Sequence, residues 1–141
     1  MRETDSRLIA LLRANAREPV ASLARKLNLA RSTVQERIAR LEREGFIKGY
    51  SVLLSEESEA GRLRAVVMIA ADSRQADRIG AELKRMPEVR ALSAVSGAYD
   101  MMALVEAETP ARMDAVLDRI GKATGVARTV SSILLSEKFS R

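Results

Sequence analysis

The order of strand-like and helix-like segments after residue 62 is the feature that most restricts the fold of this chain. Strands are predicted over residues 63–71, 89–96, 100–106 and 126–136, which are rich in β-branched and other apolar side chains. Helices are predicted over residues 74–86 and 111–122, where apolar residues recur at helical spacing. The order βαββαβ predicts a ferredoxin-like domain, in which a four-stranded antiparallel sheet carries two helices on one face.

The second face of this predicted sheet has no helix to cover it. It holds apolar residues such as Val66, Met68 and Met102. A large uncovered apolar face is normally buried by a partner. We therefore expect a homodimer or a larger assembly.

The first fifty residues predict three helices and a strand. The first helix has Thr4 or Asp5 available as its N-cap. The second begins at Pro19, and the third runs from about residue 31 to residue 44 and ends at Gly45. Residues 46–54 alternate and predict a strand, and the polar residues 55–62 predict a hinge. Two short helices joined by a tight turn form a helix-turn-helix, here winged-helix-like because a strand follows. The predicted fold class is therefore α+β, with this domain in front of the ferredoxin-like one.

The positive charge of the chain lies in this first segment. Residues 1–50 contain 11 Lys or Arg and 6 Asp or Glu, whereas residues 51–141 contain 13 of each, so the net charge of +5 belongs to the first third. A basic segment joined to a neutral one indicates a polyanion-binding module fused to a domain with another role.

The third predicted helix carries the residue types that bind double-stranded DNA. In a helix-turn-helix, the second helix of the motif lies in the major groove. The side chains predicted to reach base edges are Ser32, Thr33, Gln35, Glu36 and Arg40. The side chains predicted to contact phosphates are Arg31, Arg37, Arg43 and Lys48.

The composition argues against several other classes of protein. The chain has no Cys and no His, which removes thiolate sites, the commonest general base and the commonest metal ligand. We expect no catalytic site, no cofactor and no bound metal. The first residues lack the apolar core of a signal peptide, and the longest apolar run, residues 65–71, is too short to cross a bilayer. We therefore expect a cytoplasmic protein.

Motifs in both segments resemble the Lrp/AsnC (feast/famine) family of transcriptional regulators. In the first segment the matching residues are Leu23, Ala24, Leu29, Thr33, Val34, Arg37, Ile38, Arg40, Leu41, Glu42, Gly45, Ile47 and Tyr50. Further on they are the Gly-x-Tyr-Asp turn at residues 97–100 and the pairs Gly125-Val126 and Arg128-Thr129, followed by residues 133–135.

The resemblance implies a transcriptional regulator that responds to a small molecule, often an amino acid. It implies a DNA-binding domain over residues 1–50, a linker strand and hinge over residues 51–62, and an effector-sensing and oligomerisation domain over residues 63–141. It also implies dimers, formed through the linker strand and the sensing sheets, that assemble into tetramers or octamers. The effector is then expected between dimers, near residues 97–100.

The turn at residues 97–100 has two interpretations that are compatible with each other. As a hairpin connection, Gly97 takes an unusual backbone angle and Asp100 bonds the local backbone, while Tyr99 packs at the sheet edge or an interface. As a ligand site, the N–H groups hold a carboxylate and Asp100 holds an ammonium group. The residues predicted to contact the effector are Gly97, Ala98, Tyr99, Asp100, Thr129 and Ser131.

Departures from the family pattern and alternative functions also follow from the sequence. Ala30 stands where the family usually has a serine N-cap, which forfeits about 1 kcal/mol of helix stability, and Pro19 replaces the N-cap of the second helix. A DNA-compacting, nucleoid-type protein without an effector response is the main alternative. RNA binding is disfavoured because the central strands lack aromatic residues. Haem-biosynthesis decarboxylases of similar architecture are thought to rely on His, which this chain lacks.

Overall fold

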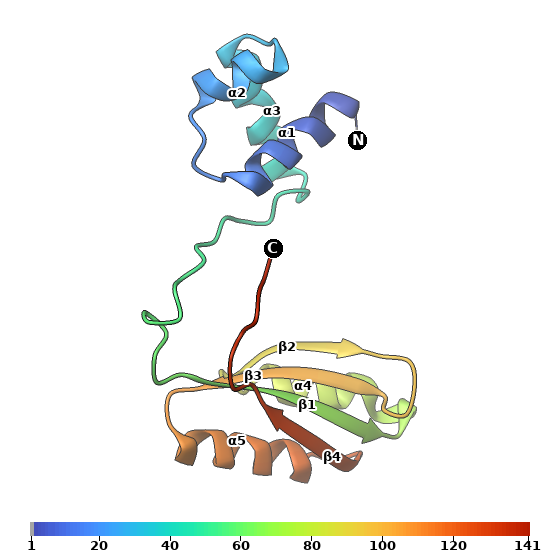
Figure 1. Cartoon of the computed structure of the whole chain (residues 1–141). Coiled ribbons are helices and arrows are strands. Elements are labelled where there is room, and N and C mark those ends of the chain that lie inside the picture. Colours follow the sequence, from blue (N-terminus) through green and yellow to red (C-terminus); the bar gives the residue numbers. More distant parts are fainter. Residues whose placement is uncertain (1) are drawn as a thin grey trace. The chain divides into compact units, whose positions relative to one another are not determined.

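The structure is a computed structural model that describes residues 2–141 (Figure 1). The chain divides into two compact units, Met1–Leu53 and Leu54–Arg141, and each is described by itself. Each unit has its own hydrophobic core.

The first unit consists of three helices around a small core. Helix α1 spans Glu3–Ala14, α2 spans Val20–Leu27 and α3 spans Arg31–Arg43. The apolar stripes of the three helices meet, and the side chains that are almost fully buried are Leu8, Leu12, Leu23, Ala24, Leu27, Val34 and Leu41. The three-helix prediction is therefore confirmed, together with the helix-turn-helix formed by α2 and α3.

The turn between α2 and α3 and the start of α1 are set by local backbone geometry. Asn28 ends α2 in the left-handed conformation with a φ of 54°, and the backbone N–H of Leu29 donates to the Ala24 carbonyl at 2.9 Å. Helix α1 begins two or three residues earlier than predicted, because its N-cap is Arg2, which makes no side-chain capping hydrogen bond. The prediction of Thr4 or Asp5 as N-cap is thus wrong, and both residues lie inside the helix.

The predicted strand over residues 46–54 is absent from the structure. The segment forms no strand, and its side chains Val52 and Leu53 are 75% and 96% exposed. A strand requires a neighbour that pairs with its N–H and C=O groups, and the described chain offers this segment none. The alternating pattern therefore marks apolar side chains that a single chain leaves in solvent.

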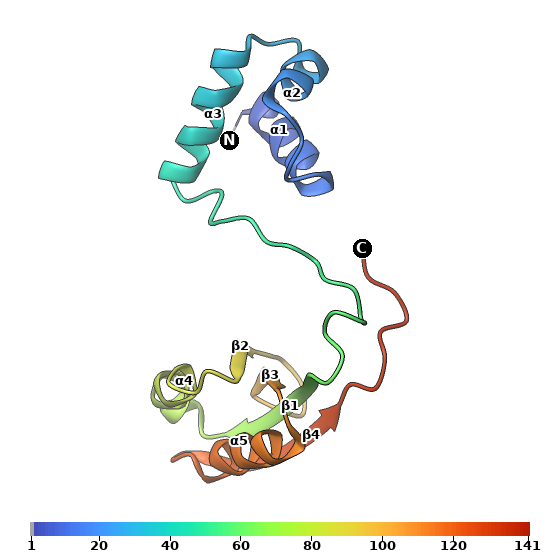
Figure 2. The same cartoon turned by 90° about the vertical axis from the view of Figure 1, so that its left-hand side faces the viewer.

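The second unit is a four-stranded antiparallel sheet with two helices on one side (Figure 2). Its elements are, in chain order, β1 (Leu63–Ala71), the 3₁₀ turn η1 (Ser73–Gln75), α4 (Ala76–Lys84), β2 (Val89–Ala94), β3 (Met101–Ala107), α5 (Pro110–Lys122) and β4 (Val126–Ile133). The strand order β2-β3-β1-β4 places β1 and β3 in the centre, and each neighbouring pair is antiparallel. The ferredoxin-like βαββαβ prediction is confirmed, although β4 ends at Ile133 and not at residue 136.

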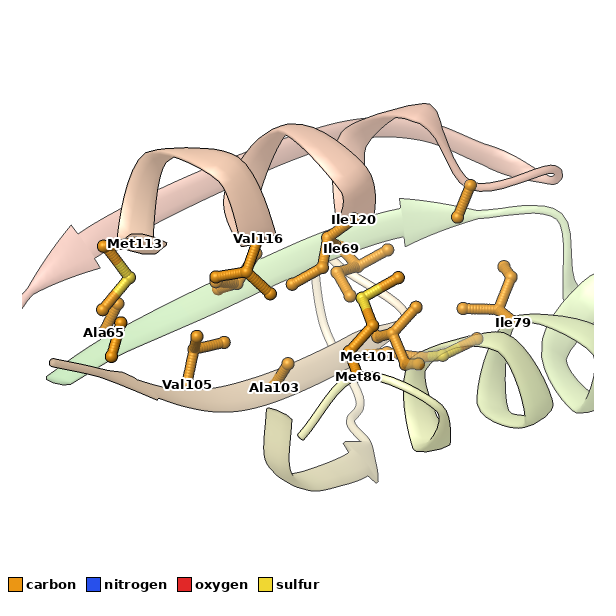
Figure 3. Packing of buried hydrophobic residues seen from close by; sticks show 14 residues of the cluster. Ala65, Ile69, Ile79, Met86, Met101, Ala103, Val105, Met113, Val116 and Ile120 are labelled. Carbon is orange, nitrogen blue, oxygen red and sulfur yellow. The ribbon is translucent and has the colours of Figure 1, made fainter. Parts of the chain in front are cut away.

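The core of this unit lies between the sheet and the two helices. Alternate residues of β1 and β3, among them Ile69 and Val105, point toward Ile79 of α4 and toward Val116 and Ile120 of α5 (Figure 3). All five side chains are at most 3% exposed. The alternation of buried and unburied residues in β1 and β3 is what leaves a second set of side chains on the opposite face.

The opposite face of the sheet is apolar and uncovered in the described chain. Leu104 of β3 and Val130 of β4 are 42% and 48% exposed, and Val66, Met68 and Met102 are half-buried. No helix within residues 2–141 has the length and apolar character needed to span a membrane.

Candidate nucleic-acid interface and ligand site

The outer face of α3 presents polar side chains with few partners. Ser32, Gln35 and Glu36 are exposed and Thr33 is half-buried. Within residues 2–141, no side-chain hydrogen bond or ion pair engages Ser32, Thr33 or Gln35, and Glu36 forms a long ion pair of 3.7 Å with Arg43. These groups are free to donate to or accept from an external partner.

The first turn of α3 has no side-chain cap. Ala30 is the N-cap residue and makes no side-chain hydrogen bond, as the sequence predicts for an alanine. The first intrahelical bond runs from the N–H of Val34 to the Ala30 carbonyl, at 3.1 Å. The N–H groups of the first turn are therefore available to solvent or to an anion, and the helix dipole favours negative charge at this end. Arg31 is exposed in the same turn.

Two arginines of α3 are held by a carboxylate of α1. Asp5 accepts a hydrogen bond of 2.9 Å from Nη1 of Arg37 at one oxygen and one of 2.7 Å from Nη2 of Arg40 at the other. The sequence analysis assigned Arg37 to a phosphate and Arg40 to a base edge. The structure instead directs both guanidinium groups toward α1, with the Arg37 and Arg40 side chains only 18% and 30% exposed.

The electrostatics of this cluster favour the ionised carboxylate. Burial by itself would raise the pKa of Asp5. The hydrogen bond from Arg37 and the charges of Arg40 and Arg37 outweigh that effect and hold the pKa below its usual value. Within the described chain, Nε of Arg40 is buried without a hydrogen-bond partner.

The chain beyond α3 folds back onto the end of the helix. Gly45 has a φ of +77°, a conformation that favours glycine, and the N–H of Ile47 donates to the Leu41 carbonyl at 3.0 Å. The Tyr50 hydroxyl donates to Glu42 at 2.8 Å. Desolvation of the hydroxyl raises the pKa of Tyr50 most, and the hydrogen bond to the Glu42 carboxylate raises it further. Lys48 lies in this segment and is exposed.

The turn at residues 97–100 joins β2 to β3 and is tied to the end of β1. Gly97 has a φ of +122°. The backbone N–H of Asp100 donates to the Ile69 carbonyl at 2.9 Å, and Oδ2 of Asp100 accepts from the N–H of Ala71 at 2.9 Å. The Asp100 carboxylate therefore bonds a neighbouring strand, whereas Oδ1 has no protein partner within residues 2–141. Gly97, Ala98 and Asp100 are exposed.

Arg128 of β4 adds a cation that the sequence analysis did not assign to this site. Its Nη1 donates to the Tyr99 hydroxyl at 3.2 Å, and its guanidinium carbon lies 4.9 Å from the centroid of the Tyr99 ring. Arg128 pairs with Ala70, next to the strand end that Asp100 holds. The carboxylate of Asp100 and the guanidinium of Arg128 thus both lie at this end of β1.

Thr129 and Ser131 lie on the other side of the sheet from Arg128. Thr129 pairs with Ile69 and Ser131 pairs with Val67, and the side chains of both β1 residues are buried under the helices. The Thr129 hydroxyl is 4.0 Å from the position that a Cβ at Gly121 of α5 would take. The structure brings Tyr99, Asp100 and Arg128 to one end of β1, but it does not bring Thr129 and Ser131 to them.

Family models match both units of the chain. Residues 64–141 match the Lrp/AsnC ligand binding domain, and residues 1–48 match a winged helix-turn-helix DNA-binding domain.

Curated relatives align over nearly the full chain. An uncharacterized HTH-type transcriptional regulator of Pyrococcus abyssi is 30% identical over 137 residues, which cover 96% of this chain and 87% of the relative. The HTH-type transcriptional regulator LysM of Saccharolobus solfataricus is 28% identical over 138 residues, which cover 97% of this chain and 95% of LysM.

Solved structures share the fold of both units. The leucine response regulatory protein LrpA of Mycobacterium tuberculosis has a TM-score of 0.83 and 32% identity, with 99% of this chain and 96% of that chain covered. A transcriptional regulator of Neisseria meningitidis in complex with L-Met has a TM-score of 0.83 and 25% identity, with 99% of this chain and 93% of that chain covered.

Proposed function

This chain belongs to the Lrp/AsnC family of DNA-binding transcriptional regulators, and from that premise we propose that it binds specific DNA sites through α3 and responds to an amino acid. In this proposal the amino acid binds near residues 97–100 and changes either the assembly of the protein or its affinity for DNA. The observation that supports DNA reading most directly is the outer face of α3, where polar side chains are exposed beside an uncapped, positively charged helix start.

The outer face of α3 divides into groups that read bases and groups that hold phosphates. Gln35 can make paired hydrogen bonds to adenine, Glu36 can accept from cytosine, and Ser32 and Thr33 can contact either kind of base edge. The exposed side chains proposed to contact phosphates are Arg31, Arg43 and Lys48. Arg37 and Arg40 are left out of both groups because Asp5 holds them.

An amino acid needs an anion site and a cation site a few ångströms apart. The exposed N–H groups of the turn and Arg128 are suited to a carboxylate, and the free oxygen of Asp100 is suited to an ammonium group. The Neisseria meningitidis structure in complex with L-Met supports this class of ligand, because that protein shares the fold of this chain.

The assembly is proposed to be a homodimer that forms tetramers or octamers. The uncovered sheet face with Leu104 and Val130, and the exposed apolar segment that includes Val52 and Leu53, both favour burial against further copies of the chain. A dimer presents two copies of α3 to two half-sites related by a two-fold axis. An effector changes DNA affinity only if it binds the two states of the assembly with unequal affinity.

The test is fluorescence anisotropy of the purified protein with DNA from upstream of its own gene, against a scrambled duplex of equal length and composition. Salt is varied, with and without a mixture of the twenty amino acids. Specific binding predicts a preference for the upstream DNA and an affinity that falls steeply with salt.

Three outcomes would contradict all or part of this proposal. Equal affinity for both duplexes contradicts specific recognition and favours a DNA-compacting protein. An affinity unaffected by every amino acid contradicts the effector part alone. The absence of binding to either duplex at low salt contradicts DNA binding by α3.

A further inference from the structure

Asp5 is the one buried charged residue found among residues 2–141. Its side chain is 4% exposed and faces α3, where each of its two oxygens accepts a hydrogen bond from an arginine. The cluster of Asp5, Arg37 and Arg40 therefore ties α1 to the helix that is proposed to enter the major groove.

The cluster lowers the positive charge that α3 presents to DNA. The Arg43 side chain is 65% exposed, whereas those of Arg37 and Arg40 are 18% and 30% exposed and point toward α1. The carboxylate also cancels one of the two positive charges at close range. Without it, both long side chains could extend from α3 and reach phosphates, because neither is fully buried.

Stability alone is a weak reason for such a cluster. Nε of Arg40 is buried without a partner in the described chain, and an unsatisfied buried donor is unfavourable. Replacing buried ionic groups by apolar side chains of similar size is often neutral or stabilising. On a helix that contacts DNA, however, each free guanidinium adds attraction to phosphates that is independent of base sequence.

We infer that Asp5 is a specificity-determining residue, because it holds Arg37 and Arg40 away from DNA phosphates and so limits the sequence-independent affinity of α3. Base discrimination is then left to the outer face of the helix. This inference rests on the proposed function, in which α3 binds DNA.

The test compares Asp5→Asn with Glu3→Gln in the full-length protein. Both variants remove one negative charge from the first turn of α1, but Glu3 is exposed and forms no ion pair within residues 2–141. The affinity for the scrambled duplex is measured by anisotropy at salt concentrations from about 50 to about 200 mM, roughly a fourfold range. If Asp5→Asn frees both arginines, the slope of log affinity against log salt steepens by up to about 1.8. Over a fourfold range of salt, the affinity of this variant then rises about tenfold more than that of the wild-type protein as salt is lowered. Glu3→Gln is expected to keep the wild-type slope.

A second variant tests the inference if circular dichroism shows that Asp5→Asn does not fold. Asp5→Asn combined with Arg37→Met and Arg40→Met replaces the whole cluster by uncharged side chains. The wild-type slope is expected, because neither arginine contacts phosphate in the wild-type protein. A slope shallower by about 1 or more would mean that the arginines already bind phosphates, and would overturn the inference.

The main result that overturns the inference is a folded Asp5→Asn variant that matches Glu3→Gln in its salt slope and in the ratio of its affinities for the upstream and the scrambled duplex. Failure of the proposed function is separate, because the wild-type protein then binds neither duplex or binds both with equal affinity.

Discussion

Replacing Asp100 by Asn and by Ala separates its structural contact from its proposed contact with a ligand. In the structure, Oδ2 accepts a hydrogen bond of 2.9 Å from the N–H of Ala71, while Oδ1 has no protein partner within residues 2–141. Asn keeps an acceptor oxygen for Ala71 but removes the negative charge. Ala removes both the acceptor and the charge.

The two roles differ in expected magnitude. The contact with Ala71 lies at an exposed position, so water can replace the lost acceptor. The free energy of unfolding should therefore fall by about 1 kcal/mol for Asp100→Ala, and by less than about 0.5 kcal/mol for Asp100→Asn. A hydrogen bond between the carboxylate and a ligand ammonium group contributes about 1.5–3 kcal/mol, so both variants should lose effector affinity by roughly 10- to 100-fold.

The assays are urea unfolding for stability and DNA anisotropy, with and without amino acids, for function. Effector-free DNA affinity should stay at the wild-type value in Asp100→Asn. An Asn variant that keeps the full amino acid response would refute the assignment of the ammonium site. Loss of effector-free DNA binding in the Ala variant alone would show that Asp100 acts through the structure of the turn.

Three further predictions concern the two cores and the uncovered sheet face. Gly125→Ala should destabilise the sheet unit by about 2–4 kcal/mol in urea unfolding, because the φ of Gly125 is +94° and a Cβ there would lie 2.5 Å from Cβ of Gln75. Gly80→Ala is the control, because Gly80 lies at an open position of a helix. This variant should be neutral or stabilising by up to about 1 kcal/mol. Because the pKa of Asp5 is lowered in the folded state, its contribution to stability is present above the unfolded pKa of about 4 and is lost as pH falls through the folded value. Wild-type stability should therefore fall more steeply below about pH 4 than that of Asp5→Asn, and parallel acid titrations by circular dichroism would contradict this. Leu104→Asp should reduce the molar mass measured by light scattering, since Leu104 is 42% exposed on the uncovered face; an unchanged mass would exclude that face from the assembly.

The elements that the sequence predicted well are those whose signal is local. Ile79 and Leu83 lie one helical turn apart, and the alternation in β1 and β3 has the period of a strand. The strand order followed from the order of these elements, because the ferredoxin-like arrangement is the usual solution for βαββαβ.

Asp5 was misassigned because its partners are more than thirty residues away in the sequence. A capping interpretation considered only its neighbours, whereas the structure pairs it with Arg37 and Arg40 of α3. A signal was nevertheless present. Asp5, Leu8 and Leu12 share one helical face, so Asp5 is a charge within an apolar stripe and requires a buried partner of opposite charge.

The placement of Thr129 and Ser131 depended on information of another kind. Their spacing of two residues predicts correctly that both face the same side of β4. Which side that is depends on the register with β1, where they pair with Ile69 and Val67. A shift of one residue would have placed Arg128 under the helices and the two hydroxyls on the uncovered face. Register is set by packing against the helices, so the strand pattern alone could not decide it.

The absent strand at residues 46–54 and the uncovered sheet face have one physical cause in common. Both sequence patterns describe surfaces that are complete only when a second chain is present. The pattern at residues 46–54 predicts a strand, yet a strand gains its hydrogen bonds only from a neighbouring strand. Leu104 and Val130 lie on a sheet face that only another surface can bury. The pattern at residues 46–54 can therefore be satisfied in an assembly although the single chain leaves it unpaired, and an oligomer that protects the amides of this segment from hydrogen exchange is the outcome that this argument requires.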